Sequence, residues 1–497
     1  MAQSHIQLNA DEISTKASRA GVVDRTFRLV LYDGLASEAM GTLTTGVFLA
    51  GFAVEIGASN LAIGLLAAVP FAVQLLQLPA VVLVERLRTR RAICTWSAGI
   101  GRCFLLAAAA APLLGPSGGV VMLIGLLAVH QALGAVGGCA WNSWMRDLVP
   151  PAAYGRFFGR RTAATTGLAT GLAFLGGLVI DIWKDGVPQY PALGYSILFG
   201  LSALIGLYGV YLLRITPDQP MAPVERRMHP LEMLSAPFRD GNFRRLIVFL
   251  SSWNFAANLA APFFAVYMMK SLDYPLRDVM ALTVASQLSN LGSLGIWGVL
   301  IDRFSNKAVL EISAPLFLLC VLGWTFTGLS WVSGFTFAIL LGIHVLMGIA
   351  TAGVALASNN IAMKLSPSGQ ATAYLAASSV ATASCAALAP ILGGLCADFF
   401  AAHQLSLAVN WSGGEGALSF EVLNFHAWTF FFGIACIAGL YSLHRLSFIE
   451  EASGSSDRLV LREWLLEARR SLHSLSSAAG LLRVVRSPLA LLQQRSG

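Results

Sequence analysis

Long apolar segments alternate with short polar segments along most of the chain. Twelve of the apolar segments have about the 20 residues that an α-helix needs to cross a bilayer. Lipid offers no hydrogen-bond partners to open strand edges, so segments as apolar as these are expected to be helical. They cover residues 28–54, 60–84, 92–113, 119–146, 161–183, 192–214, 245–269, 278–301, 308–329, 334–362, 370–399 and 426–446. The pattern therefore predicts an all-α membrane protein with twelve transmembrane helices.

The composition agrees with a membrane protein and excludes several other classes. Of the 497 residues, 56% are hydrophobic and 12% are charged, whereas an average soluble domain has about 25% charged residues. A soluble protein of this size needs more polar cover, and a disordered chain needs more charge. An ordinary nucleic-acid-binding domain is excluded as well, so we expect no nucleic acid among the partners.

The cysteines and the known enzyme motifs add no chemistry. All seven cysteines lie in apolar segments, with no CxxC pair and no histidine at metal-ligand spacing. We expect them to pack between helices and to form neither disulfides nor a metal site. Walker A, HExxH, GxSxG and Rossmann motifs are absent from the sequence. The prediction is a protein with no cofactor, no metal and no enzymatic activity, and the polar N-terminus predicts no cleavable signal peptide.

The basic residues predict the orientation in the membrane. If both termini are cytoplasmic, all but four of the 33 lysines and arginines lie on the cytoplasmic side. The exceptions are Lys184, Lys270 and Arg277 outside, and Arg102 within the membrane. This asymmetry follows the positive-inside rule for a multi-pass protein of a cell membrane, either inner or plasma membrane.

The chain contains an internal repeat with an offset of 217 residues. Residues 175–181 (LGGLVID) align with 392–398 (LGGLCAD) at five of seven identities, and residues 85–87 align with 302–304. Asn142, Leu148 and Pro150 align with Asn359, Leu365 and Pro367. Later strings match with an offset of 233, which places 16 extra residues in the outer loop 400–425. Each half has six helices, so the two repeats are predicted to be parallel.

These observations divide the chain into five parts. The first repeat covers residues 28–214 and the second covers 245–446, with a polar cytoplasmic linker at 215–244 between them. Residues 1–27 form a cytoplasmic tail. Residues 447–497 form a basic cytoplasmic tail, in which leucines and arginines between 456 and 490 have the spacing of an amphipathic helix on the membrane surface.

The loop after the second helix of each repeat resembles the signature of the major facilitator superfamily, Gly-x-x-x-Asp-Arg-x-Gly-Arg-Arg. In the second repeat, Gly298, Asp302, Arg303 and Lys307 stand at motif positions. The copy in the first repeat is weaker, with Val81 for the glycine and Glu85-Arg86 for the Asp-Arg pair. Residues 141–161 also resemble the end of helix four and the following loop of this family, including Arg146.

The resemblance implies a secondary transporter whose two halves rock about a central site. It also implies that the motif carboxylate and arginines join helix ends and favour the outward-facing state, through charge-assisted hydrogen bonds. We apply this gating interpretation to Asp302 and Arg303. For Arg88, Arg90 and Arg91 we favour the simpler interpretation that they anchor helix ends and fix the topology.

Asp33, Glu38 and Arg102 lie well inside predicted spans, away from their ends, where charge is costly and often functional. Glu38 lies near the middle of the first helix and is the preferred proton-coupling candidate; Asp33, nearer the cytoplasm, is the second. Arg102 lies at a similar depth in the third helix. A structural role, which includes a pair with Glu38, is the interpretation we favour for Arg102, and structural pairing is the alternative for the two carboxylates.

Helices one, four, seven and ten line the central cavity in the family that the sequence resembles. Amides, imidazoles and indoles on or beside these helices suit a polar or amphipathic organic solute. Hydrogen bonds between helices are the alternative role for each residue. The candidates are His130, Gln131, Trp141, Asn142, Trp144, Trp253, Asn254, Asn258, Gln287, Asn290, His344, Asn359 and Asn360.

The sequence thus predicts transport of a small polar or amphipathic organic solute by alternating access, coupled to an ion and most simply to a proton. Its expected partners are this substrate and the lipid bilayer, with the monomer as the functional form. The alternative is a membrane protein of the same fold that acts as a sensor or assembly factor without transport.

Overall fold

The structure, a computed structural model of the chain, describes residues 25–149, 151–218, 235, 237–327, 335–367, 371–401, 405–413, 416–425 and 427–451. Most of the N-terminal tail and of the predicted linker lie outside these residues. The amphipathic helix predicted in the C-terminal tail lies outside them as well.

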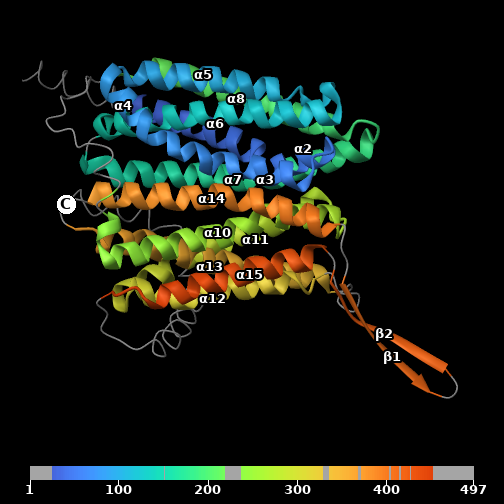
Figure 1. Cartoon of the computed structure of the whole chain (residues 1–497). Helices are drawn as coiled ribbons and strands as arrows, with labels where there is room; N and C mark the ends of the chain where they lie inside the picture. The colour runs from blue at the N-terminus through green and yellow to red at the C-terminus, as the bar shows by residue number, and fades with distance from the viewer. Residues whose placement is uncertain are drawn as a thin grey trace, which may run out of the picture. The chain divides into compact units, whose positions relative to one another are not determined.

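Helices form nearly all of the first repeat (Figure 1). Residues 25–44 form the first helix. It is followed by α2 (Gly46–Glu55), α3 (Asn60–Ala72), α4 (Gln77–Leu87), α5 (Arg90–Ala108), α6 (Gly115–Leu148), α7 (Pro151–Gly186) and α8 (Pro191–Ile215). Short 3₁₀ turns at Val73–Leu76 and Ala111–Leu114 connect α3 to α4 and α5 to α6.

The second repeat is also mostly helical, but it contains a β-hairpin between its last two helices. Its helices are α10 (Gly241–Lys270), α11 (Leu276–Arg303), α12 (Asn306–Trp324), α13 (Thr336–Leu365), α14 (Ala371–Ala401) and α15 (Ala427–Ser447). Two strands, β1 (Leu405–Gly413) and β2 (Gly416–Phe425), stand between α14 and α15. Serine side chains begin two of the helices by accepting a backbone N–H, Ser59 at α3 and Ser305 at α12.

Nine helices in the described part of the chain are long and apolar enough to cross a membrane. A tenth results if α3 and α4, which meet at 49°, form one bent span. The first helix is interrupted at Thr45, and α5 carries Arg90, Arg91 and Arg102, so neither belongs to this set. The helical membrane fold is confirmed, and the count of twelve spans stays a prediction.

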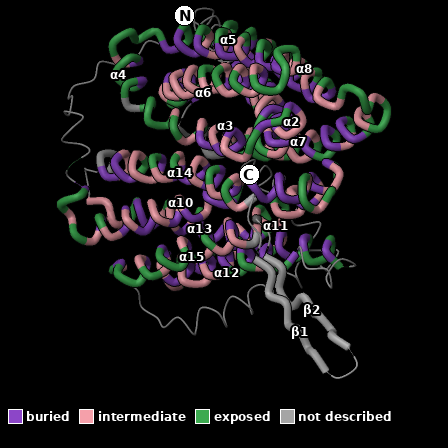
Figure 2. Tube along the Cα trace, turned by 45° about the vertical axis from the view of Figure 1, so that its right-hand side comes forward, coloured by how far each residue is buried: buried purple, intermediate pink, exposed green. Residues whose placement is uncertain are grey.

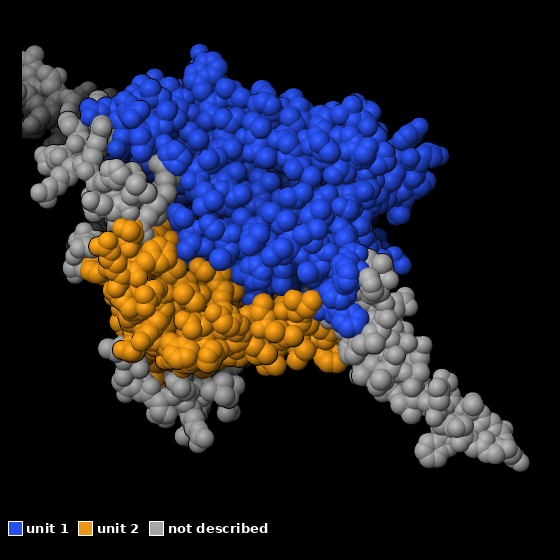
Figure 3. Space-filling model, viewed as in Figure 1, with its two compact units in different colours: residues 1–228, 254–284, 380–431 blue, residues 229–253, 285–379, 432–497 orange. Residues whose placement is uncertain are grey.

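The helices gather into two compact units, shown in different colours in Figure 3. Unit 1 contains residues 1–228, 254–284 and 380–431, and unit 2 contains residues 229–253, 285–379 and 432–497. The units do not coincide with the sequence repeats. Most of α10, the start of α11 and most of α14 cluster with the first repeat in unit 1.

The core of unit 1 is dense where α5 lies along α6 and α8 (Figure 1). Trp144 and Met145 of α6 are fully buried there with Cys94 of α5 and Leu213 of α8. The indole Nε1 of Trp144 donates to the carbonyl oxygen of Pro217 at 3.2 Å, which satisfies its only polar atom.

The core of unit 2 depends on close approach of helix backbones. A Cβ on Gly353 of α13 would lie 2.8 Å from Ser313 Cβ of α12 and 2.9 Å from the ring of Trp297 of α11. The Trp297 indole donates to the carbonyl oxygen of Ile349 at 2.8 Å. Small residues at these crossings let the helices pack without lipid between them.

The surface of the helices is apolar. Large side chains such as Trp96 (71% exposed), Val121 (72%) and Ile182 (70%) lie on the outside of unit 1, and exposed positions recur along α5 and α8 in Figure 2. Apolar surface on this scale is typical of contact with lipid.

The predicted outer loop 400–425 is a β-hairpin, which departs from a purely helical chain. The strands pair antiparallel from Leu405–Phe425 to Gly413–Gly416, with a bulge between Leu407 and Ala408. The residues of both strands alternate between apolar and polar or small, the period of a strand, and the strands lie in the loop that contains the 16 residues added to the second repeat.

Candidate functional site

A cavity of about 330 Å³ lies among five helices of unit 1. Its wall is formed by residues 44–50 of the first helix and α2, by residues 63–71 of α3, and by residues of α6 and α10. Most of the wall is apolar. Its polar groups are Thr44, Thr45, His130, Gln131 and Asn258. An apolar cavity with a few polar groups is the usual form of a small-molecule site.

The first helix is broken where it meets this cavity. Gly46 has a φ of +57°, a conformation that favours glycine, and it separates residues 25–44 from α2. The hydroxyls of Thr44 and Thr45 donate to the carbonyl oxygens of Met40 and Gly41 at 2.7 and 2.8 Å. Irregular backbone inside a membrane is tolerated where it lines a cavity, and there it presents polar groups to a ligand.

A second cavity of about 300 Å³ lies beside the first, among α5, α6 and α8. His130 and Gln131 line both cavities, while Arg102 and Trp141 line only the second. His130 Nδ1 lies 2.8 Å from the carbonyl oxygen of Gly101, so Nδ1 carries the hydrogen and donates it. His130 and Gln131 thus stand between the two cavities.

Two arginines and two carboxylates come together next to these cavities. Asp33 is 3% exposed and Arg102 is 5% exposed. Arg102 donates to Ser37 Oγ at 3.0 Å, one turn after Asp33 on the first helix. Gly209 of α8 leaves room for both: a Cβ there would lie 3.3 Å from Asp33 Oδ1 and 3.3 Å from Arg102 Nη1.

The second arginine is Arg161 of α7. Its guanidinium lies against Gly34, where a Cβ would meet Arg161 Nε at 2.5 Å, and its Cζ stands 4.9 Å from the ring centre of Trp141. Both Asp33 and Glu38 interact electrostatically with it. We refer to Asp33, Glu38, Arg102 and Arg161 as the charge cluster.

The charge cluster differs from the pairing considered from the sequence. Arg102 contacts Ser37 beside the buried Asp33, while Glu38 is exposed. Arg161 is a functional candidate that the sequence analysis missed, because it was counted among the loop charges after helix four. The structure places it ten residues inside α7, at the level of Gly34.

The other candidates on α6 have separate surroundings. Trp144 is in the hydrophobic core with its indole bonded to Pro217. Asn142, two residues earlier, is exposed. Asn359, its equivalent in the second repeat, is exposed as well.

The candidates on α10 divide between the two units. Asn258 lines the 330 Å³ cavity, and its Nδ2 donates to the carbonyl oxygen of Asn254 at 2.8 Å. Trp253 is 7% exposed and packs edge-on against Phe317 within unit 2.

The remaining candidates lie in unit 2, where hydrogen bonds between or within helices account for two of them. Asn290 of α11 donates to Gly348 O at 3.2 Å and to Thr351 Oγ1 at 3.1 Å on α13. His344 is buried, with Nδ1 at 2.8 Å from Leu340 O. Gln287 is exposed and Asn360 is half-buried.

At the predicted outer side, an aspartate of each repeat binds the first turn of a helix from the other repeat. Asp181 of α7 accepts the N–H groups of Leu276 and Arg277 at the start of α11, at 3.0 and 2.7 Å. Asp398 of α14 accepts the N–H groups of Asn60 and Leu61 at the start of α3, at 3.1 and 2.9 Å. The unsatisfied N–H groups and positive dipole of a helix N-terminus favour a carboxylate there. We call these two contacts, both within unit 1, the outer latch.

A glycine one turn before each aspartate makes the outer latch possible. A Cβ on Gly394 would lie 2.4 Å from the carbonyl oxygen of Asn60, which is too close for any side chain to be accommodated there. A Cβ on Gly177, its repeat equivalent, would lie 3.0 Å from Met280 Cγ and 3.4 Å from Arg277 Cα. Residues four apart share a helix face, so the glycine admits the opposite helix and the aspartate binds its first turn.

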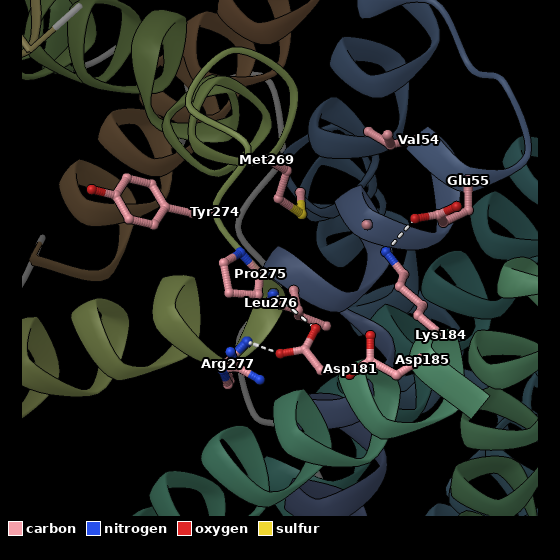
Figure 4. A pocket seen from close by; sticks show the side chains of 11 residues that line it. Val54, Glu55, Asp181, Lys184, Asp185, Met269, Tyr274, Pro275, Leu276 and Arg277 are labelled. Atoms are coloured by element: carbon pink, nitrogen blue, oxygen red, sulfur yellow. Dashed lines mark hydrogen bonds and ion pairs between the residues drawn. The ribbon is translucent and has the colours of Figure 1, made fainter. Parts of the chain in front are cut away.

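A pocket of about 260 Å³ surrounds one half of the outer latch (Figure 4). Asp181 faces the backbone of Leu276 and Arg277 in it, and Lys184 forms an ion pair with Glu55 of α2. The Asp181 and Asp398 positions close the strongest repeat string, and a charge repeated at the same end of two spans is the signal that could have identified them.

At the predicted cytoplasmic side, equivalent positions of the repeats are used differently. In the first repeat Arg90, 1% exposed, bonds Asp147 and the carbonyl oxygen of Ser143. The equivalents of Arg90 and Asp147 in the second repeat are Lys307 and Lys364, two bases. Glu451 supplies the carboxylate that these two lysines lack: it accepts hydrogen bonds from Lys364 Nζ and from the backbone N–H of Lys307, both at 2.8 Å.

The carboxyl of Glu451 is enclosed by the groups that bind it. Its side chain is 0% exposed, and Asn306 Nδ2 also donates to it at 2.8 Å. Burial by itself raises the pKa of the Glu451 carboxyl, but the hydrogen bonds from Lys364, Asn306 and Lys307 outweigh burial and lower this pKa below its ordinary value.

The motif residues are mostly exposed in this structure. Asp302, Arg303, Arg86 and Arg146 are exposed, while Glu85 and Lys307 are half-buried. A Cβ on Gly298 would meet open space.

Apolar helices of membrane length, a small cavity with polar groups among them and charged side chains buried beside it define a multi-pass membrane transport protein. The chain belongs to the Major Facilitator Superfamily, whose sequence profile matches residues 34–390. The resemblance seen in the loop motif is thereby confirmed.

Solved structures of several transporters share this fold. The nucleoside transporter NupG aligns with a TM-score of 0.62 at 12% identity, over 86% of this chain and 98% of that one. A bacterial homologue of the iron transporter ferroportin, in an inward-facing state, aligns with a TM-score of 0.60 at 13% identity, over 85% and 98%. A POT family transporter in complex with 5-aminolevulinic acid gives 0.57 at 11% identity, over 86% and 96%. No curated protein matches the chain in sequence.

Proposed function

We propose that this protein carries a small polar or amphipathic organic solute across the membrane by alternating access, driven by a proton gradient. The observation that carries the proposal is the 330 Å³ cavity, whose apolar wall is interrupted by His130, Gln131 and Asn258. Amide and imidazole groups can bond hydroxyl, carbonyl or amine groups of a solute, while the apolar wall takes its hydrocarbon part.

The outer latch supports the alternating-access part of the proposal. α2 runs from the cavity, which Ala50 lines, to the outer pocket, which Gly51 and Val54 line. The latch joins helices of the two repeats at that outer end. Opening a route from the cavity to the outside therefore requires the latch to break, and closing it requires the latch to form again.

The charge cluster supports the coupling part. With all four groups ionised, the charges of Asp33, Glu38, Arg102 and Arg161 balance. Glu38 is exposed, while the buried Asp33 interacts electrostatically with both guanidinium groups. We propose that Glu38 carries the coupling proton and that Asp33 positions the two arginines. A proton on Glu38 leaves Arg161 with one counter-charge fewer, which favours a different arrangement of the cluster.

The loop motif is proposed to stabilise the opposite, outward-facing state. Asp302 and Arg303 are exposed here, and we expect charge-assisted bonds between them and neighbouring helix ends to form when the predicted cytoplasmic ends approach each other. Asp302→Asn should then favour the state in which the outer latch is closed. Unchanged accessibility of the cavity from both sides would leave the motif as a topology anchor only.

Uptake into proteoliposomes under an imposed pH gradient, screened over sugars, amino acids, nucleosides and drugs, tests the proposed function. Glu38→Gln should abolish accumulation against a gradient and leave binding and passive exchange intact, because the neutral amide imitates a permanently protonated carboxyl. Glu38→Asp, which keeps a titratable group, should retain accumulation. Absence of any flux or binding would favour a sensor or assembly factor of this fold, and accumulation by Glu38→Gln would exclude this residue as the proton carrier.

A further inference from the structure

The β-hairpin between α14 and α15 has no counterpart in the first repeat and no part in the proposed transport. Three residues separate β1 from the end of α14, and one residue separates β2 from the start of α15. Both helices include membrane-span candidates, Tyr374–Phe400 and Phe430–Ser447. A connection of three residues reaches at most about 10 Å, so the start of β1 and the end of β2 lie close to the membrane surface.

The pairing register separates the hairpin into an apolar and a polar face. Residues directly opposite each other in an antiparallel pair lie on the same face, and successive residues alternate between faces. The register gives one face with eight apolar residues and no polar one. They are the pairs Leu405–Phe425, Leu407–Leu423, Val409–Phe420 and Trp411–Leu418.

The opposite face is polar or small throughout. Its pairs are Ser406–Asn424, Ala408–Glu421, Asn410–Ser419 and Ser412–Ala417. The bulge takes up Val422, which keeps the two sets on their own faces across the register shift. A shift of one residue would mix the faces, so this register is the one that concentrates the apolar residues.

We propose that the apolar face of this hairpin rests on the lipid of the leaflet at the predicted outer side. A two-stranded hairpin alone is marginally stable in water and needs a surface for its apolar face. The connections to α14 and α15 hold that face beside the bilayer. Its aromatic residues, Trp411, Phe420 and Phe425, are of the kind enriched at the membrane interface.

The backbone decides how deep the hairpin lies. Each of its two strands has an outer edge with N–H and C=O groups that the partner strand does not bind, and such groups are not tolerated in the hydrocarbon core. The hairpin therefore lies flat at the headgroup level, where water and headgroups bind these edges, and does not insert across the leaflet.

The charge of the segment indicates which lipid is sufficient. Residues 402–426 contain no lysine or arginine, and Glu421 on the polar face is the only charged residue in the two strands. Attraction to anionic headgroups has no basis here. Contact with the bilayer is expected in neutral phosphatidylcholine and independent of salt.

Spin labels placed singly on the two faces test this proposal in phosphatidylcholine nanodiscs. Cysteines at Leu407 and Val409 report on the apolar face, and cysteines at Ala408 and Asn410 are the matched controls on the polar face, all in a background without the native cysteines. The ratio of collisions with oxygen to collisions with a water-soluble nickel complex should be several-fold higher for Leu407→Cys and Val409→Cys than for the controls.

Two results would overturn the proposal. Equal access of nickel to both faces would mean that the hairpin stands in water. Protection of the apolar face from oxygen and nickel alike would mean that a protein surface, such as a second copy or an added strand, covers it.

A second measurement keeps the native cysteines and needs only a mild substitution. The fluorescence of Trp411 is obtained as the difference between the wild type and Trp411→Phe. If Trp411 contacts lipid, brominated phosphatidylcholine should quench this fluorescence, and the difference should shrink. A difference that persists undiminished in brominated lipid would contradict lipid contact. Neither experiment depends on a substrate, so its failure is distinct from failure of the transport proposal.

Discussion

The outer and the predicted cytoplasmic ends of the helices use the internal repeat in opposite ways. At the outer end, Asp181 and Asp398 are repeat equivalents with the same role, each binding the first turn of a helix from the other repeat. At the predicted cytoplasmic end, Arg90 and Lys307 are repeat equivalents with different partners. Arg90 binds Asp147, and the backbone N–H of Lys307 binds Glu451. Asp147 belongs to the same repeat as Arg90, and Glu451 lies just past the end of the second repeat, so neither contact joins the two repeats.

This difference shows which bonds a rocking motion has to break. Contacts that do not join the two repeats, such as Arg90–Asp147 and Lys364–Glu451, are expected to survive when the halves move as bodies. The contacts of Asp181 and Asp398 cross between repeats and have to break together. The outer latch is thus expected to control accessibility, and the cytoplasmic contacts are expected to control stability.

The largest effect is expected when both aspartates of the outer latch are changed. Asparagine has one acceptor oxygen where aspartate has two, so Asp181→Asn with Asp398→Asn loses a charge-assisted bond at each helix start, worth about 1.5–3 kcal/mol per site. If the sites add, the closed state loses about 3–6 kcal/mol, a factor of about 10²–10⁴. The rate at which an impermeant maleimide labels Ala261→Cys in the cavity from outside should rise accordingly.

Asp185→Asn is the matched control for the latch. Asp185 is exposed at the same end of α7 and lines the same pocket, but the first turn of α11 is bound by Asp181. Labelling in this control should stay at the wild-type rate. A double latch variant that labels no faster than the control would show that the latch does not limit access.

Glu451→Gln should reduce stability and leave outer labelling unchanged. The loss of hydrogen bonds to a buried charge is worth about 1.5–3 kcal/mol. Because the folded pKa of Glu451 is lowered, its contribution is complete above the ordinary value of 4.5 and is lost as the pH falls through the folded pKa. Thermal unfolding should therefore separate wild type and variant at pH 7 and bring them together in strong acid.

Glu450→Gln provides the comparison for that variant. Glu450 pairs with Arg245 but is 79% exposed, and exposed ion pairs contribute about 0–1 kcal/mol. Similar unfolding temperatures for Glu450→Gln and Glu451→Gln would contradict a stabilising role for the buried hydrogen bonds of Glu451.

The two latch glycines should differ, and the difference sharpens the comparison of the repeats. A Cβ on Gly394 meets backbone atoms of Asn60 and Leu61, which cannot yield without moving α3, whereas a Cβ on Gly177 first meets the flexible side chain of Met280. Gly394→Ala should destabilise the closed state of the latch by about 1–3 kcal/mol, and Gly177→Ala should destabilise it by less. Both effects are measured by the same maleimide labelling. Equal effects would mean that the close approach at Gly394 is not part of the latch.

The sequence was sufficient for the helical membrane fold because hydropathy and the positive-inside rule act on whole segments. It was insufficient for Arg161, which counts as one more base in a basic loop until α7 is seen to begin at Pro151. It also listed Trp144 among cavity residues, because indole chemistry is readable from sequence while burial against Met145 and Cys94 is not.

The hairpin and the outer latch show what closer attention to pattern could have given. The alternation in 405–425 is a strand signal that a loop between spans obscured. Asp181 and Asp398 are the last residues of the best-matching repeat segment. That each binds a helix of the other repeat depends on tertiary contacts, which the sequence match does not reveal. In the same way, the sequence suggests Asn290 as a substrate-binding residue, whereas in the structure its side chain forms a hydrogen bond that joins α11 to α13.

A disulfide across the outer latch tests alternating access most directly. A Cβ on Gly177 would lie 3.3 Å from Met280 Cβ, near the lower end of the about 3.5–4.5 Å that disulfides span. Gly177→Cys with Met280→Cys should therefore crosslink α7 to α11 on oxidation, in a background without native cysteines that carries Ala261→Cys. Alternating access predicts that oxidation abolishes maleimide labelling of this cavity cysteine from the outer side and preserves it from the cytoplasmic side. Outer labelling that continues at the uncrosslinked rate would contradict it.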